Sequence, residues 1–150
     1  MEYRFENSIG KLSMLVARSS GKLLEFEFRK EGIDINPSEW TCFAFINHYQ
    51  KITQKELASR TGIDKVSINR LIKKLQAKNY VEKTIDTYDK RKQIINLTNE
   101  GLKIYKSLKK IAGESLGKVY EKLDSKDFET CQNVLKQILS NLNNGLSEEY

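Results

Sequence analysis

Residues 52–97 constrain the fold more than any other stretch, because two short helical patterns are followed there by a two-stranded pattern. Thr53 and Glu56 have the spacing of a capping box, which predicts that a helix begins at this point. Gly62 stands where that helix should end, at a position that favours a positive φ. Asp64 is then placed to cap a second helix. The stretch therefore predicts a helix, a turn, a second helix and a hairpin.

The second predicted helix has two faces of opposite character. Its apolar residues recur at the spacing of one helix face, which predicts that they pack inward: Ile68, Leu71, Ile72 and Leu75. The other face carries donor-rich and mostly cationic side chains: Lys65, Ser67, Asn69, Arg70, Lys73 and Lys74. Two helices joined by a tight turn, with such a face on the second, are typical of a helix-turn-helix. In that motif the second helix enters the major groove of DNA.

The hairpin that follows carries a basic tip. Val81 to Asp86 and Gln93 to Leu97 are β-prone runs, and residues 87–92 between them have the sequence TYDKRK. A basic loop on a hairpin beside a recognition helix is a wing, which suits phosphates or a minor groove. A lysine-rich helix face alone is more often a solvated surface. The combination of that face, the turn and the basic hairpin favours nucleic-acid binding.

Four segments resemble the MarR family of bacterial winged-helix regulators. They are Val66 to Leu75, Val81-Glu82-Lys83, Asp86 to Arg91, and Leu97-Thr98-Asn99-Glu100-Gly101. Two departures from the family pattern are mild. Asn79 and Tyr80 replace the usual Gly-Leu after the recognition helix, and the wing lacks the common proline after its first aspartate. Asn adopts a left-handed conformation almost as readily as Gly, so the fold expectation stands.

The resemblance implies a mainly α fold with a small β wing, that is, a winged helix-turn-helix with long terminal dimerisation helices. Residues 1–150 would form one domain, with the winged helix-turn-helix at about 36–97 and dimerisation helices at about 5–31 and 98–144. The function implied is that of a sequence-specific transcriptional regulator, a ligand-responsive repressor that binds an inverted-repeat operator as a homodimer. Activation stays open.

The predicted DNA-contacting residues lie on the second helix of the motif and on the wing, with one at the start of the first helix. They are Thr53, Lys65, Val66, Ser67, Asn69, Arg70, Lys73, Lys74, Asp89, Lys90, Arg91 and Lys92. The resemblance places an arginine at the wing tip in the minor groove, a role that falls on Arg91. It places an aspartate beside that arginine, and Asp89 is expected to hold the guanidinium extended. Ser67 and Asn69 are short enough to reach base edges, whereas Lys73 and Lys74 are placed for the DNA backbone.

Long apolar seams flank this region. Phe5, Ile9, Leu12, Val16, Leu23 and Phe26 predict a first helix from about Phe5 to Lys30, with a second apolar set at Met14, Leu15 and Leu24. Asn36, Pro37 and Glu39 are placed to begin the next helix. Thr98 is expected to cap a fifth helix whose apolar pattern reaches Leu123, and Asp124 a last helix with Phe128, Cys131, Leu135, Ile138 and Leu142. These seams exceed what one small lobe can cover, which favours a symmetric dimer over a monomeric bundle.

Composition narrows the classes of function. Lys plus Arg number 26 against 20 Asp plus Glu, so the net charge is +6, which favours a polyanionic partner. No apolar run is long enough to cross a membrane, and the first ten residues lack the apolar core of a secretory signal, so we expect a cytoplasmic protein. We expect no cofactor and no metal, because the two cysteines do not form a CxxC pair. No nucleophile–base pair or phosphate-cradling glycine loop indicates an enzyme.

Several alternatives stay open. A sequence-tolerant architectural DNA-binding protein would carry a similar charge, and a winged helix can serve as a protein-binding adaptor. Some members of the family sense oxidants through a thiol, but Cys42 and Cys131 are both expected to be packed as small hydrophobes. His48 is expected at a helix end, without a catalytic or metal role. Family members bind small aromatic or phenolic effectors, and Tyr49, Tyr105 and Tyr120 are candidates to line a cavity or to fill the core.

Overall fold

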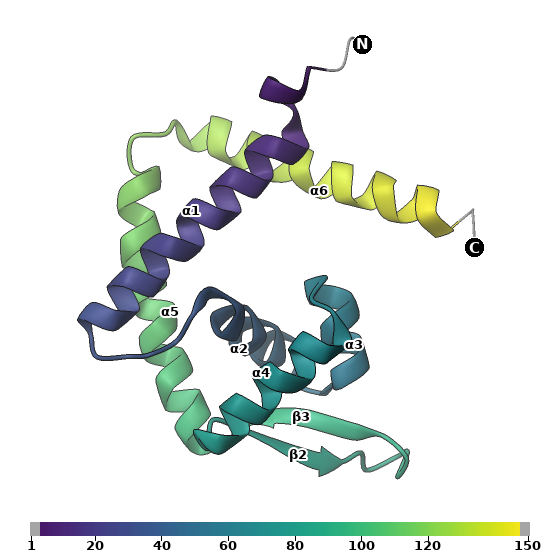
Figure 1. Cartoon of the computed structure of the whole chain (residues 1–150). Coiled ribbons are helices and arrows are strands. Elements are labelled where there is room, and N and C mark those ends of the chain that lie inside the picture. Colours follow the sequence, from purple (N-terminus) through teal and green to yellow (C-terminus); the bar gives the residue numbers. More distant parts are fainter. Residues whose placement is uncertain (1–3, 148–150) are drawn as a thin grey trace. The chain divides into compact units, whose positions relative to one another are not determined.

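The structure is a computed structural model that describes residues 4–147, with side chains described for residues 4–144. Its helices and strands follow one another along the chain as shown in Figure 1. They are η1 (Phe5–Asn7), α1 (Ile9–Lys30), α2 (Pro37–Tyr49), β1 (Ile52–Thr53), α3 (Gln54–Thr61), α4 (Lys65–Ala77), β2 (Val81–Ile85), β3 (Gln93–Leu97), α5 (Asn99–Tyr120) and α6 (Ser125–Ser147). The fold is mainly α with a small β wing, as the sequence predicts.

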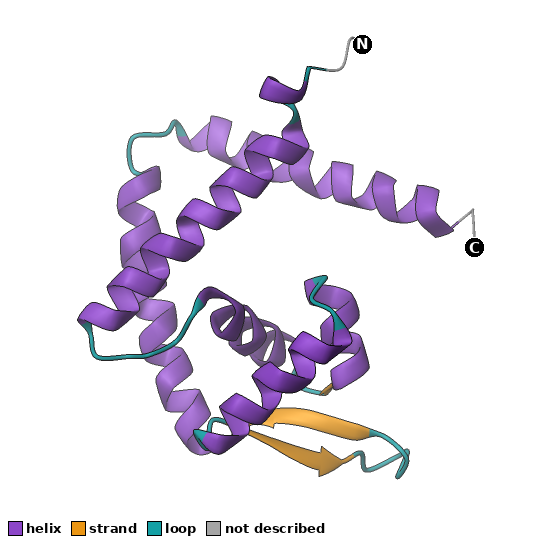
Figure 2. Ribbon diagram, viewed as in Figure 1, coloured by secondary structure: helices purple, strands orange, loops and turns teal. Residues whose placement is uncertain are grey.

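Helices α2 to α4 and the sheet form the part of the chain that we call the winged lobe, residues 37–97 (Figure 2). The sheet is antiparallel in the order β1-β3-β2, with Ile52 opposite Ile95 and Lys83 opposite Ile95 from the other side. The strand β1 was not predicted, because two residues are too short to show a period. It is the edge strand of the three-stranded sheet, next to β3, and it leads directly into α3.

The buried core of the lobe is apolar and comes from every helix of the lobe. Phe43 and Ile46 of α2, Leu57 of α3, and the inward face of α4 are buried, together with Ile52, Val81 and Ile95 of the sheet. Of the four residues predicted to face inward on α4, Ile68, Ile72 and Leu75 are fully buried and Leu71 is half-buried. The predicted apolar face of this helix is therefore confirmed.

Trp40 joins the lobe to its neighbouring helices. Its ring lies edge-on to Phe28 of α1 and stacks on Tyr105 of α5, with ring centroids 5.8 Å apart in both pairs. Phe28 is fully buried, although it lies outside the apolar series predicted for the first helix. Phe28 thus anchors the carboxyl end of α1 to the lobe.

Two predicted helix boundaries were wrong. The first helix begins at Ile9 and not at Phe5, because the Ser8 side chain accepts a hydrogen bond from the Lys11 amide and caps the helix there. Residues 5–7 form a separate 3-10 turn. The fifth helix ends at Tyr120, so Leu123 lies in the turn that follows it and not on the helix.

Gly101 explains why α5 can begin where it does. The Thr98 hydroxyl accepts a hydrogen bond from the Gly101 amide at 2.9 Å and so caps the helix, as predicted. A Cβ on Gly101 would overlap the carbonyl oxygen of Tyr80. Asn79, just before Tyr80, has a φ of 58°, the left-handed conformation expected of an asparagine here. The glycine therefore permits the close approach of α5 to the turn that follows α4.

The chain divides into two compact units, residues 1–115 and 116–150. The second unit contains the last turns of α5 and all of α6. Within it, the rings of Tyr120 and Phe128 pack with centroids 5.1 Å apart. Asp124 caps α6 by accepting hydrogen bonds from the Lys126 and Asp127 amides, so the predicted start of this helix is confirmed.

Candidate nucleic-acid interface

Local capping sets the geometry of the two helices of the motif. The Thr53 side chain accepts a hydrogen bond from the Glu56 amide, and the Glu56 carboxylate accepts one from the Thr53 amide at 2.8 Å. Gly62 ends α3 with a φ of 69°. Asp64 caps α4 through the Ser67 amide at 2.9 Å, and hydrogen bonds from the Ser67 side chain and amide hold the pKa of Asp64 below its usual value. The capping box, the turn glycine and the second cap are all confirmed.

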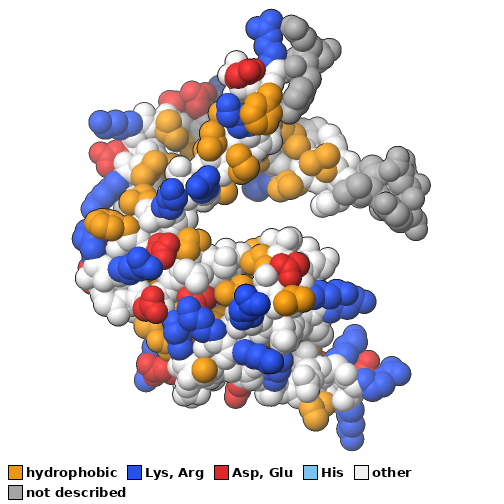
Figure 3. Space-filling view, in the orientation of Figure 1, with side chains coloured by type: hydrophobic (Ala, Val, Ile, Leu, Met, Phe, Trp, Pro, Cys, Tyr) orange, Lys and Arg blue, Asp and Glu red, His pale blue; other side chains and the backbone are white. Residues whose placement is uncertain are grey.

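The side chains predicted to contact DNA on α4 differ in exposure. Lys65, Arg70 and Lys73 are exposed, and Val66 is 70% exposed although it is apolar. Ser67 and Asn69 are half-buried. Figure 3 shows Lys and Arg side chains over this helix and over the tip of the wing. The outward face of α4 thus offers cations, one apolar side chain and partly recessed polar groups.

A chain of three side chains crosses the lobe at Asn69. The Lys83 ammonium, on β2, donates to Gln54 Oε1 at 3.0 Å. Gln54, at the start of α3, donates through Nε2 to Asn69 Oδ1 at 3.3 Å. All three side chains are half-buried. Neither Gln54 nor Lys83 was predicted from sequence, because these contacts join residues 15 and 29 positions apart.

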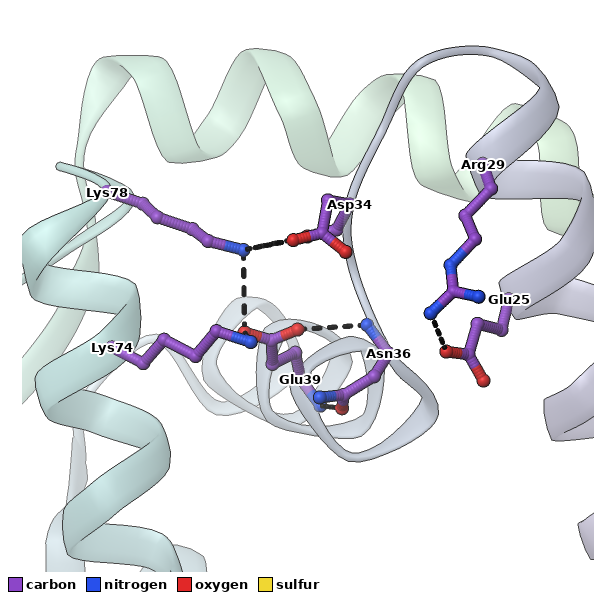
Figure 4. A network of polar contacts seen from close by, with 7 residues as sticks. All are labelled: Glu25, Arg29, Asp34, Asn36, Glu39, Lys74 and Lys78. Carbon is purple, nitrogen blue, oxygen red and sulfur yellow. Dashed lines mark hydrogen bonds and ion pairs between the residues drawn. The ribbon is translucent and has the colours of Figure 1, made fainter.

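Lys74 does not point freely toward solvent, in contrast to the other cations of the predicted set. Its ammonium lies 3.0 Å from Oε1 of Glu39, a side chain of α2 that is fully buried (Figure 4). Glu39 Oε2 accepts a hydrogen bond from the Asn36 amide, and Lys78 lies 3.6 Å from Oε1. The hydrogen bond and charge of Glu39 raise the pKa of Lys74.

This network fixes the position of α4, and it pairs the charge of Lys74 with a buried carboxylate. Lys78 also donates to the Asp34 carbonyl at 2.7 Å, so the end of α4 is tied to the segment between α1 and α2. Sequence reasoning assigned Glu39 to a cap, which is confirmed by its bond to Asn36. It missed the ion pair with Lys74, because the two residues lie on different helices. A contact of Lys74 with DNA stays a prediction.

Asp86 shapes the tip of the wing. Its carboxylate accepts hydrogen bonds from the Tyr88 amide at 2.9 Å and the Asp89 amide at 2.8 Å. These bonds hold the pKa of Asp86 below its usual value. The backbone closes the loop where the Asp86 amide donates to the Lys92 carbonyl. The tip is therefore a hydrogen-bonded turn and not an open loop.

Arg91 projects from this turn, with 92% of its side chain accessible. Asp89 Oδ1 accepts hydrogen bonds from the Arg91 Nε at 3.2 Å and from its backbone amide at 3.1 Å. The pKa of Asp89 is lowered, chiefly by the Arg91 side chain. The expected contact between the two side chains is present, and it is made by Nε and not by a terminal nitrogen of the guanidinium.

A cleft of about 580 Å³ lies between the amino end of α3 and the part of the wing where its tip joins β3. Its lining includes the cations Lys55, Arg91 and Lys92, of which Lys55 was not predicted. Thr53 also lines the cleft, but its hydroxyl donates to the Glu56 carboxylate at 2.7 Å. Any contact of Thr53 with DNA would therefore compete with the cap of α3.

A second pocket, of about 450 Å³, lies between α2 and α5. It is lined by Ala44, Phe45, His48, Tyr49 and Tyr105. Tyr49 and Tyr105 thus line a cavity, whereas Tyr120 packs on Phe128 in the second unit. The guanidinium of Arg60, on α3, lies 4.1 Å from the centre of the Tyr49 ring. This cation–π contact connects the pocket to the first helix of the motif.

The two cysteines lie in different environments. Cys42 is fully buried, and burial, with a smaller contribution from the charge of Glu39, raises its pKa to about 12. Cys131 is exposed on α6, so the expectation that both thiols are packed was wrong for this residue. Leu135, Leu139 and Leu142 of α6 are exposed as well, which periodicity alone could not reveal.

The described residues offer neither a metal cluster nor a membrane-spanning helix. Among residues 4–147, no cluster of His, Cys, Asp and Glu side chains is arranged to hold a metal ion. Within the same residues, no helix has the length and apolar content to cross a membrane. His48 lies exposed in the last turn of α2, against the ring of Tyr49, as expected of a helix-end residue.

Known proteins share this architecture. A model of the MarR family matches residues 33–92. The transcriptional regulator SarZ of Staphylococcus haemolyticus is 27% identical over 128 residues, which are 85% of this chain and 86% of SarZ. A MarR variant from E. coli, solved with operator DNA, aligns with a TM-score of 0.74 at 23% identity, covering 87% of this chain and 93% of that one. The S. aureus MepR–DNA complex aligns with a TM-score of 0.76 at 18% identity, covering 93% and 99%.

The fold and the capped, cation-bearing α4 beside its wing define a winged helix-turn-helix protein. Over residues 33–92 the chain matches the MarR family, and it is similar in sequence to the transcriptional regulator SarZ.

Proposed function

We propose that this protein regulates transcription by binding DNA sequence-specifically, with α4 in a major groove and the wing in the adjacent minor groove. The observation that carries the proposal is the pairing of two outward-facing basic elements on one lobe. The face of α4 bears Lys65, Arg70 and Lys73, and the turn of the wing holds Arg91 extended. Cations on both elements suit a polyanion better than they suit a protein partner.

The amino end of α4 is the proposed reading end. Val66 is exposed and apolar, which suits the methyl group of thymine, and Asn69 can hydrogen-bond a base edge. Lys73 lies a turn further on, where a helix that enters by its amino end leaves the groove for the phosphates. Base reading and phosphate contact thus fall to different residues.

The proposed binding unit is a dimer. The exposed apolar residues of α1 and α6 support it, since large apolar side chains on one helix face are rarely left in water. Two winged lobes related by a two-fold axis would read an inverted repeat with half-sites roughly 10 bp apart. Bound across a promoter, such a dimer would repress by occlusion.

Footprinting against the promoter beside the protein's own gene tests the proposal. We expect protection of an inverted repeat, with Asn69→Ala relaxing the sequence preference and Lys73→Ala weakening binding to all sequences. Lys73→Ala should also flatten the dependence of affinity on salt by about one unit. Equal losses on specific and random DNA for both variants would favour an architectural, sequence-tolerant protein instead.

The pocket between α2 and α5 is the proposed site for a small aromatic or phenolic effector. Its aromatic walls suit such a ring, and the Tyr49–Arg60 contact offers a route to α3. Trp40 is the only tryptophan and stacks on Tyr105, so its fluorescence should report occupancy. Titration with phenol or benzoate should change this fluorescence and lower DNA affinity, and Tyr105→Ala should abolish both effects. Tyr88→Ala, on the wing, is the matched control. An unchanged signal and affinity would contradict an effector of this class.

A further inference from the structure

The chain of hydrogen bonds from Lys83 through Gln54 to Asn69 has a direction, and that direction bears on base recognition. We infer that Gln54 and Lys83 are specificity-determining residues, which fix the Asn69 amide so that its NH₂ group faces the DNA and reads a hydrogen-bond acceptor. This inference rests on the proposed function and deepens it, because it specifies the base edge that Asn69 recognises.

The direction follows from the chemistry of the lysine. An ammonium group donates hydrogen bonds and cannot accept them, so the Gln54 atom that lies 3.0 Å from Lys83 Nζ must be the amide oxygen. The other end of the Gln54 amide is then its NH₂ group. The assignment of amide O and N is often ambiguous, but a donor-only neighbour removes the ambiguity here.

The orientation of the Gln54 amide determines the orientation of the Asn69 amide. Gln54 Nε2 donates to Asn69 at 3.3 Å, so the Asn69 atom that faces α3 must be Oδ1. Its Nδ2 therefore points away from Gln54. Within residues 4–144, no side-chain or backbone group accepts a hydrogen bond from this nitrogen. The donor end of the amide is thus left for a ligand on the outward side of α4.

The burial of the three side chains gives the arrangement its stability. All three are half-buried, so turning one amide over would place two donors face to face where water replaces the lost hydrogen bond less readily. The three residues come from β2, α3 and α4, so the amide of the recognition helix is braced by the other two elements of the lobe.

A fixed donor selects among the bases. An unconstrained asparagine pairs well with adenine, because it accepts from N6 and donates to N7. With its oxygen directed to Gln54, Asn69 instead matches guanine, whose N7 and O6 both accept, and next thymine, through O4. We therefore expect guanine over adenine at the base position that Asn69 reads.

Selection of bound sequences from a library of randomised DNA duplexes tests this inference. The base position is identified as the one where Asn69→Ala loses its preference. The decisive variant is Gln54→Glu, which keeps the shape of the side chain and its contact with Lys83. The carboxylate offers only acceptors, so the Asn69 amide should turn over to donate to it and present its oxygen to the DNA. The ratio of guanine to adenine at that position should fall about tenfold or more.

Two further variants separate this effect from charge and from misfolding. Gln76→Glu adds the same charge at an exposed position of α4 and should lower affinity without changing the preferred base. Lys83→Met removes the donor that sets the direction, so guanine and adenine should become nearly equivalent. Circular dichroism should show that each variant folds.

The outcomes distinguish the inference from the proposed function. If the unmodified protein selects a sequence but prefers adenine at the Asn69-dependent position, the inference fails and the proposed function stands. The same conclusion follows if Gln54→Glu behaves as Gln76→Glu does. If the unmodified protein selects no sequence, both fail together.

Discussion

The winged lobe and the terminal helices α1 and α6 share the same apolar periodicity and differ in what covers it. On α4, Ile68 and Ile72 have no accessible surface. On α1, Val16 is 60% exposed, and on α6, Leu139 is 61% exposed. Periodicity therefore identifies a face that avoids water, but not the surface that covers it. In the lobe the cover is another helix of the same chain, and for the terminal helices we propose a second copy.

The two regions also differ in how their helices are held. Side-chain caps fix both helices of the motif, and contacts between distant residues brace α4 from α2 and α3. The described part of α6 has a cap at Asp124 and a row of exposed leucines. The lobe is thus defined by contacts within the chain, whereas we propose that the exposed faces of the terminal helices are covered by assembly. Four predictions follow this contrast.

The largest expected effect is on assembly. Light scattering at micromolar concentration should give about twice the 17.4 kDa mass of the chain. Joint replacement of Leu135 and Ile138 by Asp should give monomers or insoluble protein, because charges would then occupy the proposed interface. A stable, well-folded monomer of the unmodified chain would contradict the proposal that a second copy covers the terminal helices.

Next in size is the difference between two glycines of α5. Gly101→Ala should lower the free energy of unfolding by about 1–3 kcal/mol, because the added Cβ would overlap the Tyr80 carbonyl oxygen. Gly113→Ala is the matched control, since a Cβ there meets nothing within 4 Å. It should stabilise the helix by about 0.5–1 kcal/mol. Chemical denaturation measures both, and equal effects would show that the close approach at Gly101 is not needed.

The wing should give a smaller effect, on affinity alone. Arg91→Ala should weaken operator binding about tenfold, or about 1.4 kcal/mol, because an extended guanidinium sheds water readily and fits a narrow groove. Arg91→Lys should restore only part of the affinity. Asp89→Ala should also weaken binding, since Asp89 holds Arg91 in place. If Asp89→Ala binds more tightly, the wing acts only through its net charge.

How much could be read from the sequence depends on the distance between interacting residues. The caps at Thr53, Asp64 and Asp124 were predicted because each involves neighbours three positions apart, and so was the helix-turn-helix. Contacts across the lobe, such as Lys74 with Glu39, were not, because nothing local records which helix a lysine will meet. The exposure of Cys131 was missed for a related reason. A periodic face does not say whether its cover comes from the same chain.

The last prediction compares the two thiols, one in each region. Cys42 should not react with a disulfide reagent until the protein unfolds, because burial excludes the reagent and a pKa of about 12 keeps the thiol protonated at neutral pH. Cys131 is exposed in the chain but shares a face of α6 with Leu135 and Leu142. It should therefore react slowly in the dimer and quickly in the monomeric variant of Leu135 and Ile138. Mild peroxide should leave DNA binding unchanged in the parent and in Cys131→Ser alike. If peroxide releases the parent protein from DNA but does not release Cys131→Ser, Cys131 is an oxidant sensor. The exposed face of α6 would then act in redox sensing as well as in assembly.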